Sequence, residues 1–292
     1  MKKTLTCALL ASLFTLTACG GGGSDSPVSV NQPINGGGTN TPTTPTTPTN
    51  NGFVVSGKAV KFENGKQTGT MNSEFNDQML IVRVDGHEMW HITEYKAPNK
   101  GMVYVYDEVN KKYTDKPDDY TGRFQYAVFG LKYHYADPNN PSTYVYYTGK
   151  HNATQDMPKT GKAHYVGAVL AYRPSDRTVF TDESYYSSKY PNLYDGVKQD
   201  PITFDVDFAN KTVNGKINKL HAWENGWDKP SGKEIKNIEL SATIKGNTFS
   251  GTKNGVTTEG VFVGAKAVEM TGLFKDDNNK IQGAFGARQQ GK

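Results

Sequence analysis

Short segments of alternating polar and apolar residues, separated by turn signals, run from residue 53 to the end of the chain. Examples are QMLIVRVD, STYVYYTG and IELSATIKG, and the turn signals between such segments include ENGK, KNGV and DDNNK. Alternation with a period of two places apolar side chains on one face of a β-strand, and turn signals of this kind connect hairpins. The 17 tyrosines, 13 phenylalanines and 31 glycines suit the same structure, and no amphipathic stretch of helical length stands out. The sequence therefore predicts an all-β protein.

The first residues, MKKTLTCALLASLFTLTAC, have the arrangement of an export signal. Two lysines precede an apolar run that is too short to span a bilayer as a mature helix. The run ends in LTAC, which resembles the bacterial lipobox, where cleavage before the cysteine leaves a residue that is acylated. The resemblance implies that residues 1–18 are a lipoprotein signal peptide and that Cys19 carries the lipid anchor, with a buried structural cysteine as the alternative. Cys7 would leave with the signal, so the folded part would contain no disulfide.

The segment that follows, GGGGSDSPVSVNQPINGGGTNTPTTPTTPTNNG, contains no aromatic residue and almost nothing to bury. A flexible coil of this length averages about 30 Å from end to end, and the Thr-Pro part would be stiffer. We therefore expect residues 19–52 to be a lipidated cysteine and a disordered tether that holds a globular body away from a membrane.

The charge balance gives no reason to expect a nucleic-acid partner. Without the two lysines of the signal, 31 basic residues face 29 acidic ones. The resulting net charge of about +2 supports neither nucleic-acid binding nor general adhesion to anionic lipid.

The stretch HEMWH, from His87 to His91, fits the pattern His-Glu-x-x-His of zinc peptidases. That motif needs a helix, on which positions i and i+4 share a face and converge on one metal. Here the turn pair Asp85-Gly86 follows a β-branched run, so the motif would begin the returning strand of a hairpin. On a strand the two histidines stand about 13 Å apart, beyond the reach of one metal. We expect no metal, and with no Gly-x-Ser-x-Gly elbow or phosphate loop either, no enzyme.

The later half of the chain predicts a closed barrel. Apolar residues alternate along PITFDVDFANKTVNGKI, IELSATIKGNTFSGT and the final TTEGVFVGAKAVEMTGLFKDDNNKIQGAFGARQQ, and glycines recur along them. Closing a small barrel requires sharp bends and close backbone approach, which glycine permits. These segments predict an up-and-down antiparallel barrel of about eight strands, filled by side chains.

The same segments resemble the C-terminal barrel of the transferrin-binding protein B-like surface lipoproteins of Gram-negative bacteria. The resemblance extends from about Tyr144 to Arg288, and the part before Tyr144 fits only as a generic β "handle". It implies a β-sandwich or handle domain at 53–150 and an eight-stranded antiparallel β-barrel domain at 151–292. The residues that carry it are Val206-Asp207-Phe208-Ala209-Asn210-Lys211-Thr212-Val213 with Gly215, Gly260-Val261-Phe262 with Gly264, Ala267 and Glu269, Gly283-Ala284-Phe285-Gly286-Ala287-Arg288, and, before these, Tyr147, Gly149, Thr154, Met157, Pro158, Gly161, Tyr165 and Gly167.

What the resemblance implies about function is capture of a host protein. Members of the family are lipid-anchored at the cell surface in the outer membrane, reach it through a surface-lipoprotein translocator, and bind transferrin, lactoferrin, haemoglobin with or without haptoglobin, or complement factor H. Those that take iron hand their cargo to a TonB-dependent outer-membrane receptor. A single handle and barrel is most similar to the haemoglobin–haptoglobin utilisation lipoproteins, so haemoglobin is the expected ligand, with factor H or transferrin as alternatives.

Two aromatic segments are the candidate binding site. SYYSSKYPNLYDG and HAWENGWDKPSG place rings among small polar residues, and rigid aromatic side chains supply much of the energy of protein interfaces. The alternative is that some of these rings pack onto the barrel. The expected ligand-binding residues are Tyr185, Tyr186, Tyr190, Tyr194, Trp223 and Trp227.

A haem carrier is the alternative of another class. Haem inside the barrel would use His134 or His221 as its axial ligand. A lone histidine in a loop is more often a solvated side chain, so we expect no cofactor.

Overall fold

The computed structural model describes residues 52–76, 81–91, 124, 126–134, 142–149, 156–182, 200–224 and 229–291. They lie in one compact unit, Thr46–Lys292. They form antiparallel strands and one short 3-10 turn, Ala265–Ala267, so the all-β prediction is confirmed. No helix of the described part is long and apolar enough to cross a membrane. The predicted signal, Cys19 and the tether lie outside the described residues.

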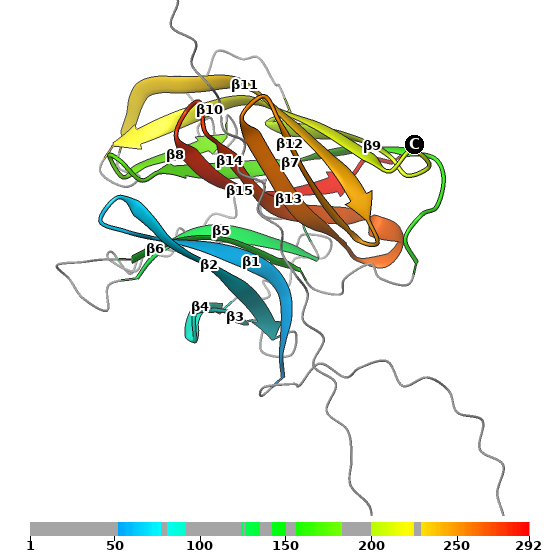
Figure 1. The fold of residues 1–292 in the computed structure, drawn as a ribbon, viewed down its shortest axis with the longest axis horizontal. Coiled ribbons are helices and arrows are strands. Elements are labelled where there is room, and N and C mark those ends of the chain that lie inside the picture. The colour runs from blue at the N-terminus through cyan, green and yellow to red at the C-terminus, as the bar shows by residue number, and fades with distance from the viewer. Residues whose placement is uncertain are drawn as a thin grey trace, which may run out of the picture. The chain divides into compact units, whose positions relative to one another are not determined.

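Six strands form the first sheet, which we call the handle sheet (Figure 1). Their order across the sheet is β4-β3-β2-β1-β6-β5, and each neighbouring pair is antiparallel. The strands are β1 (Phe53–Glu63), β2 (Lys66–Asn76), β3 (Ile81–Val84), β4 (His87–His91), β5 (Ala127–His134) and β6 (Ser142–Gly149). The HEMWH stretch is thus strand β4, as predicted, and it pairs with β3.

The handle sheet curls so that the β3–β4 turn reaches strands that are not its neighbours. Asp85 in that turn accepts a hydrogen bond from the Tyr144 hydroxyl at 3.2 Å and lies 3.4 Å from the Lys61 ammonium. Inside the curl, side chains from β1, β2, β3 and β6 form an apolar cluster: Ala59, Phe75, Val82, Val84, Tyr144 and Tyr146. The handle sheet therefore has a small core of its own.

Nine strands form the second sheet, which closes into a barrel because β11 pairs with β10 as well as with β12. The strands are β7 (Lys162–Arg173), β8 (Thr178–Asp182), β9 (Ile202–Asp207), β10 (Thr212–Glu224), β11 (Lys229–Lys245), β12 (Thr248–Lys253), β13 (Val256–Val263), β14 (Glu269–Asp276) and β15 (Ile281–Gln289). A closed sheet has no free edge.

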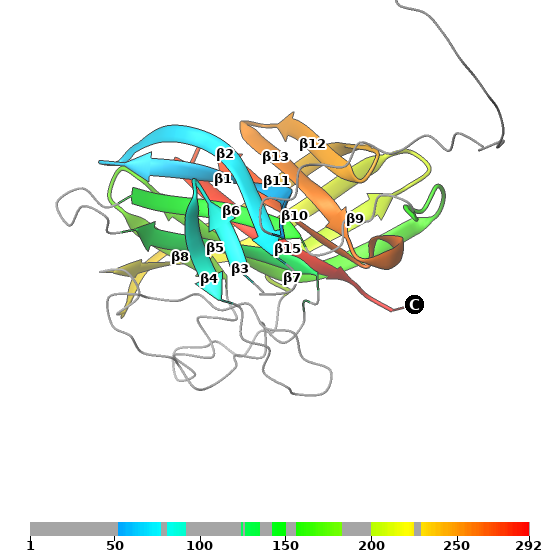
Figure 2. The ribbon, with the colours of Figure 1, turned by 90° about the horizontal axis from the view of Figure 1, so that it is seen from below.

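The nine strands occupy eight positions around the barrel. Both β8 and β9 lie between β7 and β10, because each pairs with both of those strands. The first half of β7 pairs with β9 and its second half with β8, and the two short strands lie toward opposite ends of β7 (Figures 1 and 2). The barrel is therefore eight-stranded, as predicted, with one strand position split in two.

Side chains fill the inside of the barrel, and glycines make room for them. A Cβ on Gly283 would overlap the ring of Phe274, its partner on β14. Because glycine has no side chain, the ring can lie flat across the neighbouring strand. The barrel contains four such directly opposed pairs: Phe204 with Gly215, Phe249 with Gly260, Phe285 with Gly272, and Phe274 with Gly283.

One apolar cluster joins the handle sheet to the outer wall of the barrel. It contains Phe129 and Leu131 of β5 together with Leu273 of β14 and Ala284 of β15. The close approach again depends on a glycine, since a Cβ on Gly286 would lie 2.5 Å from the ring of Phe129. The division into domains at residue 150 stays a prediction, but the two sheets share this core.

Candidate functional site

Trp223 is the one predicted binding residue whose side chain the structure describes, and it is not on a loop. It lies on β10, pairs with Val179 of β8, and is 2% exposed. Its indole Nε1 donates a hydrogen bond to Thr181 Oγ1 at 2.7 Å. The segment HAWENGWDKPSG, which was expected to bind a ligand, is therefore mostly strand, because the β10–β11 ladder continues to Glu224 and Lys229. Trp223 packs in the wall, which was the alternative for such rings.

The other candidate aromatics lie outside the described residues, but the ends of their segments are described. Tyr185, Tyr186, Tyr190 and Tyr194 fall between β8 and β9, which occupy the split strand position. Trp227 falls in the sequence between β10 and β11. Whether these rings bind a ligand stays a prediction.

The segment between β8 and β9 leaves and rejoins the barrel in the middle of its wall. At the point of departure, the buried carboxylate of Asp182 accepts a hydrogen bond from the Val169 N–H at 2.9 Å. At the return, Asn218 on β10 donates to the carbonyl oxygens of Pro201 at 3.0 Å and of Asp200 at 2.6 Å. The polar groups that an interrupted ladder would expose are thus bonded at both ends. Asp182 and Asn218 therefore bond backbone groups at the two junctions where the wall is interrupted.

Several connections meet at one end of the barrel, which we call the rim. It comprises the β7–β8 turn at 174–177, the paired ends of β10 and β11 at Glu224 and Lys229, and the turns at 254–255 and 277–280. The β1–β2 turn of the handle sheet joins them, because a Cβ on Gly65 would lie 2.9 Å from the Pro174 carbonyl oxygen. Turns on a rigid β scaffold are a usual place for binding function. The rim thus gathers connections from both sheets.

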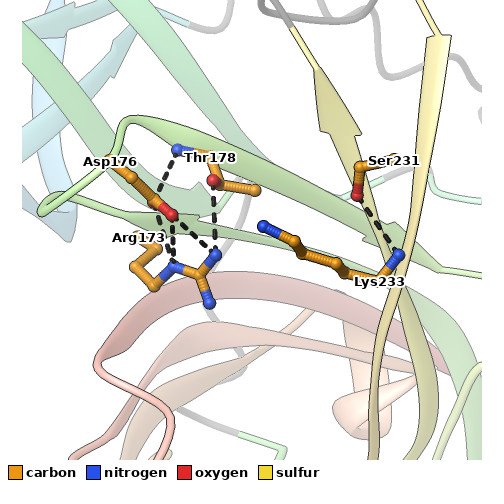
Figure 3. A network of polar contacts seen from close by, with 5 residues as sticks. All are labelled: Arg173, Asp176, Thr178, Ser231 and Lys233. Carbon is orange, nitrogen blue, oxygen red and sulfur yellow. Dashed lines mark hydrogen bonds and ion pairs between the residues drawn. The ribbon is translucent and has the colours of Figure 1, made fainter.

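A polar network holds the β7–β8 turn at the rim (Figure 3). Arg173 donates from Nε to Asp176 Oδ1 at 2.9 Å and from Nη2 to Asp176 Oδ2 at 2.7 Å, and the Thr178 N–H also donates to Asp176 at 3.2 Å. The hydrogen bonds from Arg173 lower the pKa of Asp176 to about 2. Because the pKa is lower in the folded state, the stabilisation from this carboxylate is present above its ordinary pKa and is lost as the pH falls toward about 2.

Sequence reasoning missed Arg173, Asp176 and Thr178, which we now place at the rim. The letters YRPSDRT do contain a signal, since a Pro-Ser-Asp turn with an arginine before it favours this kind of bonded turn. The sequence does not reveal that the turn lies at the same end of the barrel as Glu224 and Lys229, the paired ends of β10 and β11.

Comparison with known proteins shows what the barrel resembles. Residues 157–289 match the family model described as the C-lobe and N-lobe β barrels of transferrin-binding protein B. The barrel is similar to those of transferrin-binding protein B (TbpB). TbpB of Haemophilus influenzae is 27% identical over 190 residues, which cover 60% of this chain and 28% of that protein. An uncharacterized protein of Haemophilus influenzae is 31% identical over 157 residues, covering 51% of this chain and 44% of that protein.

The fold of the chain is also that of TbpB. A crystal structure of a TbpB variant from Haemophilus parasuis matches with a TM-score of 0.50 and 19% identity, over 82% of this chain and 46% of that one. The chain therefore spans less than half the length of this protein and of both Haemophilus influenzae relatives. The predicted resemblance to TbpB is confirmed, whereas the closer likeness to haemoglobin–haptoglobin utilisation lipoproteins stays a prediction.

Some residues that carried the TbpB resemblance make structural hydrogen bonds at the end of the barrel opposite the rim. One of them also holds the start of β5. Glu269, 1% exposed at the start of β14, accepts hydrogen bonds from the backbone N–H groups of Tyr126 at 2.8 Å and Ala127 at 2.9 Å. The Tyr165 hydroxyl donates to the Ala267 carbonyl oxygen at 2.6 Å. These motif residues of the TbpB-like barrel are structural, so they identify the fold rather than the ligand.

The two histidines considered for haem lie on strands and not on loops. His221 is a buried residue of β10, and its Nδ1 lies 3.4 Å from a carboxylate oxygen of Glu234 on β11. His134 is the last residue of β5, and its side chain is outside the described set. Among the described residues, no three His, Cys, Asp or Glu side chains gather as metal ligands would. The interior of the TbpB-like barrel is occupied by apolar side chains.

Proposed function

We propose that this chain is a lipid-anchored outer-membrane surface protein that captures a host iron-carrying protein. The observation that carries the proposal is the match of residues 157–289 to the TbpB barrel. The curated relatives named for transferrin binding share that barrel, and the rim of this one gathers connections from both sheets. A lipobox-like LTAC before a segment rich in Gly, Thr and Pro supports the anchor.

Within this class we propose haemoglobin, free or bound to haptoglobin, as the captured protein. The choice rests on the likeness of the sequence to the single-lobe utilisation lipoproteins. In this role the chain would reach the surface through a translocator and hand its cargo to a TonB-dependent receptor. Transferrin and complement factor H are the competing ligands.

Capture from human serum and red-cell lysate tests the proposal. The chain without residues 1–19 is immobilised, and bound proteins are identified and then measured as purified components. We expect saturable binding of haemoglobin or its haptoglobin complex. Saturable binding of transferrin or factor H, but not of haemoglobin, would show that haemoglobin is the wrong ligand. If haemoglobin, its haptoglobin complex, transferrin and factor H all fail to bind saturably, the proposed function is contradicted.

The predicted aromatic anchors give a sharper test. Replacing Tyr190 or Trp227 with alanine should weaken capture by at least about 2 kcal/mol, roughly thirtyfold, with little change in melting temperature. If a ring binds the ligand and does not pack in the barrel core, its removal weakens the interface and leaves the folded protein nearly as stable. If alanine at Tyr185, Tyr186, Tyr190, Tyr194 and Trp227 together leaves capture intact, these segments are not the site.

The anchor is tested separately. Changing Cys19 to alanine removes the atom that would be acylated, so we expect the protein to be released from membranes. A Cys7 to alanine variant is the matched control, because that residue would be removed with the signal. Retention of the Cys19 variant in the outer-membrane fraction would contradict the anchor.

A further inference from the structure

Three polar side chains lie at inward-facing positions of the rim. Arg173 ends β7, Thr178 begins β8, and Lys233 lies near the start of β11. Side chains on a strand alternate between its two faces, so a residue two positions from an inward one also points to the barrel axis. The corresponding inward residues, all in the barrel core cluster, are Ala171, Phe180 and Ile235. The mouth of the barrel at this end thus carries two cationic side chains.

Arg173 is held in place by its neighbours and keeps one free edge. Its Nε and Nη2 are bonded to Asp176, and Nη2 also lies 3.4 Å from Thr178 Oγ1. Its guanidinium carbon lies 5.1 Å from the centre of the Phe180 ring, and its side chain is only 22% exposed. Within the described residues, nothing accepts a hydrogen bond from Nη1. A fixed guanidinium with an open edge is well suited to bind a carboxylate or phosphate oxygen.

Lys233 reaches toward the same network from the other strand. Its backbone N–H donates to Ser231 Oγ at 3.2 Å, and Gly232 between them has a φ of 73°, so the start of β11 is bent. Figure 3 shows its side chain extending from β11 toward Arg173 and Thr178. Two other lysines of β11 and β12 have carboxylate partners, Lys236 with Glu234 and Lys253 with Glu239. In the described part of the chain, the ammonium of Lys233 has no such partner.

We propose that Arg173, Lys233 and Thr178 form an oxyanion site at the barrel mouth, and that it takes the carboxylate of an acidic side chain on the captured protein. Two cations that point toward each other repel one another, and an anion placed between them turns this repulsion into attraction. Asp176 already neutralises one edge of Arg173, so the cluster has room for one further negative group. A partner carboxylate fits because the site opens at the rim, beside the ends of β10 and β11 that flank the predicted binding residue Trp227 in the sequence. This inference rests on the proposed function.

The first experiment measures haemoglobin capture by the mature chain and two matched variants. Lys233→Ala removes the unpaired cation, and Lys245→Ala removes an exposed lysine at the opposite end of the same strand. We expect Lys233→Ala to weaken capture by about tenfold and to reduce its dependence on salt concentration, because a desolvated charge pair is lost. The affinity of Lys245→Ala for haemoglobin should stay within about twofold of that of the parent, because an exposed charge far from the rim contributes little to binding. Equal affinities for the parent and Lys233→Ala, with equal melting temperatures, would overturn the inference.

A second experiment needs no host protein. Inorganic phosphate is titrated into the chain labelled with ¹⁵N-arginine, and the Arg173 Nε–Hε resonance is followed by NMR. We expect a saturable shift in the parent and in Lys245→Ala, and its loss in Lys233→Ala. A saturable shift in a chain that captures no host protein would support the oxyanion site while the proposed function fails. A shift combined with undiminished capture by Lys233→Ala would overturn the assignment to a partner carboxylate.

Discussion

The barrel and the handle sheet differ in how the backbone groups at the edges of a β-sheet are satisfied. The barrel closes on itself through the β10–β11 pairing, so all its strands have two neighbours. The handle sheet is open, with β4 and β5 at its ends. At the start of β5, side chains of the barrel satisfy the backbone instead, because Glu269 accepts from two N–H groups and Thr271 Oγ1 lies 3.4 Å from the Val128 carbonyl oxygen. The handle therefore depends on the barrel for polar as well as apolar contacts.

The two regions also differ in how they pack. The barrel uses four opposed phenylalanine–glycine pairs, whereas the described handle strands contain one pair of this kind, Tyr146 with Gly130. Rings that lie across glycines fill a narrow barrel without forcing its strands apart. The barrel should therefore tolerate substitutions less well than the handle sheet, and four measurements test this contrast.

The largest effect is expected for Trp223→Ala. Removing a buried indole and its bond to Thr181 should lower the free energy of unfolding by about 3–5 kcal/mol. The melting temperature should fall by roughly 10 °C or more, which differential scanning calorimetry would record. An unchanged melting temperature would show that the ring does not pack in the wall. Trp223→Phe separates the contributions, since it keeps most of the packing and loses the hydrogen bond.

Glu269→Ala should lower the free energy of unfolding by about 3 kcal/mol. Its local effect should be largest in the handle sheet. The substitution leaves the Tyr126 and Ala127 N–H groups without their acceptor in a buried place. Hydrogen exchange should increase at β5 and β6 more than in the barrel interior. Glu239→Ala on the outer face of β11 is the control, and its exchange pattern should match the parent. Equal protection of β5 in both variants would contradict the dependence of the handle on the barrel.

Gly283→Ala in the barrel and Gly69→Ala in the handle sheet test packing directly. A Cβ at position 283 overlaps the Phe274 ring, so we expect a loss of about 2 kcal/mol. At position 69 the nearest atom is the flexible end of Met71 at 3.3 Å, so stability should change by less than about 0.5 kcal/mol. Chemical denaturation measures both. Comparable losses at the two sites would remove the proposed difference in packing.

The smallest effect, and one of opposite sign in the two regions, is expected from threonine to valine changes. Thr258 in the barrel and Thr148 in the handle are both 0% exposed. Thr148 Oγ1 is bonded to Ser56 Oγ, whereas Thr258 Oγ1 has no hydrogen-bond partner among the described residues. Thr258→Val should therefore stabilise the protein by about 1 kcal/mol, and Thr148→Val should destabilise it by about as much. Destabilisation by Thr258→Val as well would show that the Thr258 hydroxyl is bonded in solution.

Much of the barrel was predictable because its signals are local. The alternation in PITFDVDFA and IELSATIKG predicts strands that the structure contains, and the tight turn at Asn210–Lys211 is present between β9 and β10. The strand assignment of His87–His91 followed from the Asp85–Gly86 turn before it. The candidate site was less predictable. Trp223 was expected on a loop, since its neighbours include a Gly and a Pro, but pairing with β8 and β11 continues the strand through it.

The sequence by itself determined most of the strands and the turns between them, because these depend on residues within a few positions of each other. Only the tertiary structure decided that β8 and β9 share one strand position, that Glu269 holds the start of β5, and that Arg173 and Lys233 lie at one rim. Each of these depends on which strands become neighbours when the sheet closes. Closure is settled by the summed packing of the whole barrel, and no short segment of the chain contains that information.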